Sequence, residues 1–334
     1  MPIAMVGDMA QQFNALRNTG TIKTDLARLT QELSSGRVKD ATAHLGEGTA
    51  RFAGIDYSLD QAAAFLRVGD ETAQYLTQVQ NVLARVDGLR VETASDLLLI
   101  GDGSSDAQVS EAALSARDTF AVMVETLNTR LGDRAILGGA AVDRAPLAAA
   151  DVMLADLTTA IGGATDAATI LAAVDDWFSN PTAGFAVTGY LGDTGPMPEK
   201  RVSETRSFTM QARADDPGIV AVLRDAAVAA LANDLPTIDI ATRRSLLQSA
   251  GQGLMTGASG LVAVQARVGY LEAGVADAQA EMNGRKAALA MARNEMISAD
   301  PFETATALQA VQVQLETHFS ALSRMARLNL TRFL

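Results

Sequence analysis

Few side chains in this sequence have types and spacing that could do chemistry. His44 and Glu47 lie three residues apart, so two metal ligands could stand side by side there. A metal site needs more ligands than these, and the second histidine, His318, is far away in the sequence. We therefore interpret His44 as a solvated side chain. His318 falls at a heptad position, where a partly buried interface residue is expected.

Phosphate binding and nucleophilic catalysis are weakly supported. Residues 251–260 (GQGLMTGASG) imitate a glycine-rich phosphate loop, but no strand precedes them and no P-loop lysine follows. A flexible helix joint is the favoured interpretation of this run. Three serines that could act as nucleophiles have no nearby histidine base in the sequence, namely Ser34, Ser35 and Ser259.

The remaining candidates for metal or thiol chemistry are also excluded. Asp102 and Asp106 lack the glutamate and the ligand series of an EF-hand loop. The chain contains no cysteine, which excludes disulfides, thiolate metal sites and cysteine nucleophiles. We therefore expect no cofactor, no metal and no catalytic residue, and predict that the protein is not an enzyme.

Composition favours long, thin helix packing. The 334 residues are 48% hydrophobic but only 4% aromatic, so few residues can fill a thick core. A formal charge of −12 disfavours nucleic acid and anionic membranes, which carry the same sign of charge. The N-terminus has no signal-peptide pattern and no apolar run is long enough to span a bilayer. If the protein is exported, we expect a route without a cleaved signal.

The last third of the chain carries the strongest helical pattern. Apolar or small residues recur there at spacings of three and four: Leu261, Val264, Val268, Leu271, Val275, Ala278 and Met282. After a break at residues 298–301 the pattern resumes and continues to the end of the chain. Such a seam requires a long partner helix. Arg267 adjoins the seam, and we expect it to pair with a carboxylate of the facing helix, at Asp70, Glu71 or Asp87.

The other segments supply that partner and a central insert. An amphipathic repeat that begins with Phe13 and Leu16 ends at Gly36, and residues 37–54 are predicted to be an extended linker. A long helix is expected over 57–100, and a third helix continues through 131. A loop or hairpin is predicted for 131–145, short helices for 146–161 and 166–178, and a small β structure for 185–213. A helix over 217–233 precedes the last long helix. Trp177 and Phe178 are expected to anchor a small core of the insert.

Four segments, in the right order, carry a family resemblance. Residues 30–40 (TQELSSGRVKD), 128–148 (NTRLGDRAILGGAAVDRAPLA) and 266–272 (ARVGYLE) resemble motifs of the bacterial flagellin family. Residues 298–334, which end in LNLTRFL, are similar to the C-terminus of its hook-associated protein 3 branch. The resemblance covers both ends of the chain and hardly constrains the centre.

The resemblance implies a structural protein of the bacterial flagellum that joins hook to filament. Its partners would be further copies of itself, hook-associated protein 1, flagellin, the flagellar export apparatus and an export chaperone, with no nucleic acid and no membrane. It would lie outside the cell. Three alternatives stay open: a filament flagellin, a needle, tip or filament protein of a related secretion system, and an enzyme hidden in the insert.

The predicted fold is mainly α, an elongated coaxial bundle of paired N- and C-terminal helices with a small inserted α+β domain. The expected domains are a terminal assembly domain (1–40 and 298–334), a long-helix core (41–145 and 236–297) and the insert (146–235). We expect the terminal segments to be poorly ordered in the free monomer, because one amphipathic helix cannot offset its ordering entropy. The predicted assembly interface is Leu26, Leu29, Leu33, Leu315, Phe319, Leu322, Leu328, Leu330 and Phe333.

Overall fold

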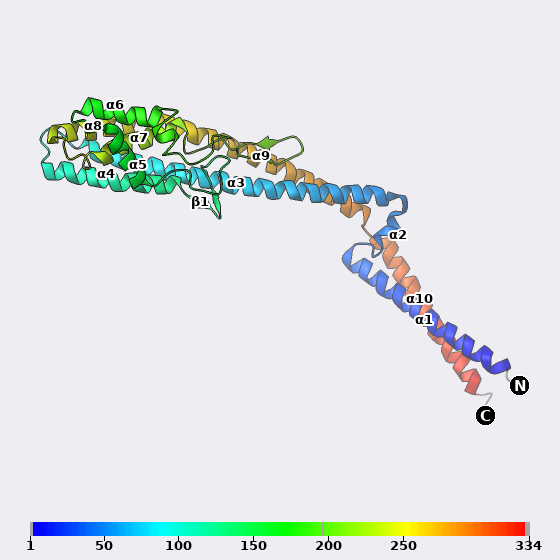
Figure 1. The fold of residues 1–334 in the computed structure, drawn as a ribbon. Coiled ribbons are helices and arrows are strands. Elements are labelled where there is room, and N and C mark those ends of the chain that lie inside the picture. The colour runs from blue at the N-terminus through cyan, green and yellow to red at the C-terminus, as the bar shows by residue number, and fades with distance from the viewer. Residues whose placement is uncertain (1–2, 196, 331–334) are drawn as a thin grey trace. The chain divides into compact units, whose positions relative to one another are not determined.

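A computed structural model of the chain describes the backbone of residues 3–195 and 197–330. Side chains are described for the same residues except 3–8, 11, 12 and 326–330. The protein is mainly α, as predicted, and its strands are two-residue pairs (Figure 1). The chain divides into two compact units, unit 1 (residues 1–63 and 284–334) and unit 2 (residues 64–283).

Unit 1 is built on two long helices that pack side by side (Figure 1). They are α1 (Ile3–Ser35) and α10 (Pro301–Leu330). They run antiparallel, because Thr19 lies opposite His318 while Arg37 lies opposite Ser298. The short helix α2 (Ala41–Leu45) and the 3-10 turn η1 (Gly46–Gly48) follow α1. The unit also holds the first residues of α3 (Thr49–Leu98) and the last residues of α9 (Ala258–Met296).

Unit 2 packs several helices around one hydrophobic core. Its helices besides α3 and α9 are α4 (Asp106–Leu127), α5 (Ala150–Ile161), α6 (Ala167–Ser179), α7 (Pro217–Leu231) and α8 (Ile240–Thr256). Helix α7 is buried along most of its length, since α4 and α8 both pack against it. Two hairpins complete the unit: β1 (Arg130–Leu131) with β2 (Arg134–Ala135), and β3 (Lys200–Arg201) with β4 (Ser207–Phe208).

Side-chain caps explain where the helices of unit 2 begin. Ser105 and Gln108 form a capping box at the start of α4. Asp166 accepts the Thr169 amide at 2.9 Å to open α6, and Asp239 accepts the Thr242 amide at 2.8 Å to open α8. These backbone donors lower the pKa of both aspartates.

Two predicted segments differ from the structure. Residues 37–54 are not an extended linker: Asp40 caps α2 by accepting the Ala43 amide, and α3 already begins at Thr49. The β structure expected over 185–213 is reduced to β3 and β4, and a 3-10 turn, η2 (Gly184–Ala186), takes its first part. The reason is packing, because η2 places Phe185 against Trp177 and Phe178 in the core.

The insert does not have a core of its own. The aromatic cluster of Trp177, Phe178, Phe185 and Tyr190 belongs to the same continuous core as residues of α4, α7 and α8. The Trp177 indole donates to Asp156 at 2.9 Å, which fixes α6 against α5. The expected insert therefore packs as part of unit 2, because its apolar faces are covered by the neighbouring long helices.

The helix joint predicted over residues 251–260 is found at a single residue, and the predicted partner of Arg267 is wrong. The helix breaks only at Gly257, while other glycines of the run sit at close approaches between helices. A Cβ on Gly253 would lie 2.5 Å from the Asp225 carboxyl carbon, and one on Gly218 would lie 2.4 Å from the Gly260 carbonyl oxygen. Arg267 pairs with Asp216, beside the start of α7, instead of with a carboxylate of α3.

Candidate assembly surface

The two helices of unit 1 meet along a narrow apolar seam. Ile22 and Leu29 of α1 are buried, and Leu26 of α1 with Leu315 and Leu322 of α10 is half-buried. These positions follow the spacing of three and four that the sequence predicts for a helix pair. Because only one neighbouring helix covers each stripe, the seam buries few residues completely.

A polar contact lies within the seam. The His318 Nε2 atom is 3.0 Å from the Thr19 hydroxyl and 3.2 Å from the Ala15 carbonyl oxygen. The predicted interpretation of His318 as a partly buried interface residue is confirmed. Because this contact is satisfied in one alignment of the two helices, it favours the observed register of α1 and α10.

The loops that follow α1 and precede α10 are joined through their backbones. The Val38 amide donates to the Ile297 carbonyl, and the Ala299 amide donates to the Gly36 carbonyl, both at 3.0 Å. Gly36 has φ of +66°, a left-handed conformation that favours glycine and ends α1 after the two serines. Glu32 is buried and accepts the Lys39 amide at 3.0 Å, so α1 is tied to the chain that follows it.

Outside the seam, both helices carry large apolar side chains that no described residue of unit 1 covers. Phe13 and Leu16 are 69% and 67% exposed, and Phe302 of α10 is 83% exposed. Among the side chains of these two helices that the structure describes, the exposed large apolar ones are Met9, Phe13, Leu16, Leu33, Phe302, Val313, Phe319 and Met325. Exposed apolar side chains at this density are typical of surfaces that bind another protein.

The predicted interface residues fall into three groups: those in the seam, those that are exposed, and those outside the described residues. Leu29 is buried inside the seam, and Leu26, Leu315 and Leu322 are half-buried there. Leu33 and Phe319 are exposed. The side chains of Leu328 and Leu330, and the whole of Phe333, lie outside the described residues. Thus Leu33 and Phe319 lie open to a neighbour, whereas Leu29 serves the pairing within the chain.

Six exposed apolar residues in the described parts of α1 and α10 were missing from the predicted interface: Met9, Phe13, Leu16, Phe302, Val313 and Met325. Leu16 lies in the N-terminal repeat, but a heptad stripe does not say which side faces the partner helix. Phe302 and Val313 are eleven residues apart, which is about three helical turns, so they share a second face of α10. That spacing is the signal in the sequence that could have found them.

The candidates for metal or nucleophile chemistry do not assemble into a site. His44 and Glu47 are both exposed, and the described residues contain no group of three or more His, Asp or Glu side chains that could hold a metal ion. The hydroxyls of Ser34 and Ser259 each donate to the backbone carbonyl three residues earlier in the chain. None of the described helices combines the length and the apolar character of a membrane span.

Comparison with known proteins supports the fold. No protein-family model matches the chain, and no curated protein matches it. Its structure is similar to that of a protein from Vibrio parahaemolyticus assigned as a flagellar hook-associated protein, with a TM-score of 0.54 and 11% sequence identity. The match covers 75% of this chain and 97% of the other. This likeness shows that the two proteins share a fold.

Proposed function

We propose that the protein is a structural subunit of the bacterial flagellum that assembles through its paired terminal helices. The observation that carries the proposal is the apolar surface on α1 and α10, where Phe13 and Leu16 have no cover. Neighbouring copies would bury these side chains and add the apolar contacts that a two-helix seam lacks. The flagellin-like motifs and the fold shared with the hook-associated protein point in the same direction.

Within the flagellum, we propose a place at the junction of hook and filament. The support is the C-terminal segment 298–334, which resembles the hook-associated protein 3 branch. Such a subunit would contact hook-associated protein 1 on one side and flagellin on the other, and would act without cofactor or catalysis. A filament flagellin is the alternative, because it would use the same helix pair and the same exposed surface.

We also propose that the chain reaches the cell exterior through the flagellar export apparatus, held by an export chaperone and without cleavage of a signal. The thin seam of unit 1 supports this route. Helices that bury few side chains have a low free energy of local unfolding. The two terminal segments can therefore enter an export channel as extended chain. The same feature would make the terminal surface available to a chaperone before export.

Assembly in solution tests the proposal directly. We expect the wild-type chain to form oligomers as its concentration rises, measured by sedimentation velocity. The double variant Phe13→Ser and Leu16→Ser should raise the concentration needed by about tenfold or more, since each lost apolar contact costs on the order of 1 kcal/mol or more.

A matched control comes from unit 2. Leu99 directly follows α3 and is 81% exposed, so Leu99→Ser removes an open apolar side chain without changing α1 or α10. This variant should assemble as the wild type does. If it assembled as poorly as the double variant, or if the double variant assembled normally, the proposed surface would be wrong.

Deletion of the gene separates junction from filament. Cells with hooks but no filaments, and with monomeric flagellin in the medium, are the expected result for a junction subunit. Loss of the filament protein itself, with the junction intact, would identify a flagellin. Normally motile cells would exclude both roles.

A further inference from the structure

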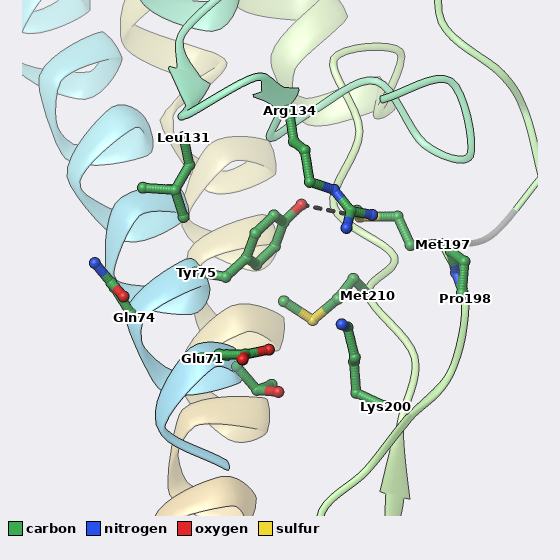
Figure 2. Close-up of a pocket in the computed structure, with 10 residues that line it drawn as sticks. Glu71, Gln74, Tyr75, Leu131, Arg134, Met197, Pro198, Lys200 and Met210 are labelled. Carbon is green, nitrogen blue, oxygen red and sulfur yellow. Dashed lines mark hydrogen bonds between the residues drawn. The ribbon is translucent and has the colours of Figure 1, made fainter. Parts of the chain in front are cut away.

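A small cavity of about 210 Å³ lies in unit 2 between α3 and the two hairpins (Figure 2). Its apolar wall consists of Tyr75 from α3, Leu131 from β1, and the thioether side chains of Met197 and Met210. Both methionines are buried. The Tyr75 hydroxyl donates to the Ile136 carbonyl and lies 3.1 Å from the Met197 sulfur, so the ring is held in place. The result is a fixed, polarizable wall suited to a flat apolar group.

The charges around this wall are unequal. Arg134 and Lys200 carry positive charge at the cavity, and Glu71 carries the opposing negative charge from α3 (Figure 2). Among the residues that line the cavity, Glu71 is the single carboxylate beside these two cations. The cavity therefore has one positive charge in excess, although the protein as a whole has a formal charge of −12. A carboxylate ligand would supply the missing partner.

We propose that this cavity binds a small aromatic carboxylate. The ring would lie against Tyr75, Met197 and Met210, because thioether sulfur contacts aromatic rings favourably. The carboxylate would lie between Arg134 and Lys200. The volume is below the range of about 300–1,000 Å³ that drug-sized ligands occupy, so the ligand carries one ring and a short acid chain. The site belongs to unit 2 and goes beyond the proposed assembly function.

Binding of 3-phenylpropionate to the full-length chain tests this site, with saturation-transfer NMR to detect contact and a titration to measure affinity. Phenethylamine is the comparison ligand, because it has the same ring and a chain of similar length but the opposite charge. We expect the acid to bind and the amine to bind at least about tenfold more weakly. Equal binding of the two ligands, or no binding of the acid at millimolar concentration, would overturn the proposal.

Variants locate the bound acid. Arg134→Gln and Lys200→Gln should each weaken binding about tenfold, since each removes a charged partner of the carboxylate. Glu71→Gln should strengthen it, because the nearest opposing charge is lost. Arg85→Gln on α3 is the control, since Arg85 is exposed and does not line the cavity. Undiminished binding by the double variant of Arg134 and Lys200, with Trp177 fluorescence showing an intact fold, would contradict the assignment.

Discussion

Helices α7 and α1 differ in both composition and cover: α7 is almost entirely apolar, whereas α1 carries many polar side chains. In unit 2, α7 is buried along most of its length because α4 and α8 pack on two of its sides. In unit 1, α1 has one long partner, and its buried described side chains are Ile22, Leu29 and Glu32. A helix that is apolar on most sides is buried by neighbours within the chain, whereas an amphipathic helix with one partner buries only a narrow stripe. Unit 2 finds those neighbours within the chain, and we propose that unit 1 finds them in other copies.

Truncating one phenylalanine in each unit should show the largest contrast. Phe120 in α4 is completely buried, so Phe120→Ala should lower the free energy of unfolding of unit 2 by about 3–5 kcal/mol. Phe13→Ala should change the stability of the monomer by less than about 0.5 kcal/mol, since Phe13 is exposed. Urea unfolding followed by helical circular dichroism reports on both units, and the fluorescence of Trp177, the single tryptophan, reports on unit 2 because it lies in that core. Equal losses for the two variants would break the comparison.

Close packing between helices gives a smaller effect. Gly253→Ala would place a Cβ 2.5 Å from the Asp225 carboxyl carbon, and we expect a loss of about 1–3 kcal/mol in the same unfolding measurement. Gly88 in α3 has open space at its Cβ position, so Gly88→Ala is the matched control. That control should stabilise by about 0.5–1 kcal/mol, because alanine favours the helix. A destabilising Gly88→Ala with a neutral Gly253→Ala would contradict the packing.

A buried acid in unit 2 should give the smallest effect, visible as a pH dependence. Burial raises the pKa of Asp225, and the Arg224 guanidinium at 3.0 Å partly opposes that rise. The folded state then binds a proton more readily than the unfolded state, so this group's contribution to stability falls as pH rises from about 3.9 through the raised pKa. Compared with Asp225→Asn, the wild type should lose stability over this range by at most about 1.4 kcal/mol per pH unit.

Asp166 supplies a control of opposite sign. The Thr169 amide lowers the pKa of Asp166, so its contribution is present above the ordinary aspartate pKa and is lost as pH falls through the lowered pKa. Relative to Asp166→Asn, the wild type should therefore gain stability as pH rises through the acid range. Chemical unfolding at a series of pH values measures both differences, and parallel trends for the two aspartates would refute the assignment.

The helical framework was predictable because period and caps act locally. The stripe from Leu261 to Met282, the stop at Gly36 and the break before Pro301 all agree with the structure. The early start of α3 at Thr49 was not predictable, because the glycines in that region also occur in turns. Arg267 pairs with Asp216, which lies in a distant segment of the sequence. A local sequence pattern cannot predict such a pair.

The two candidate sites differ in how much of each the sequence contains. The exposed face of α1 follows a helical period, so Phe13 and Leu16 could be placed on the helix before the structure was known. The cavity beside Tyr75 depends on non-periodic segments around Met197 and Met210, which meet α3 only in the folded chain. Sequence reasoning therefore finds surfaces of long helices more readily than cavities closed by loops.

Hydrogen exchange on the monomer at low concentration tests the central claim most directly. We predict that amides of α1 and α10, including those of Leu29 and Leu322, exchange orders of magnitude faster than amides of α4 and α7, and become protected when the chain assembles. Strong protection of the terminal helices in the monomer, equal to that of unit 2 and unchanged by assembly, would contradict the claim that unit 1 is completed by its neighbours.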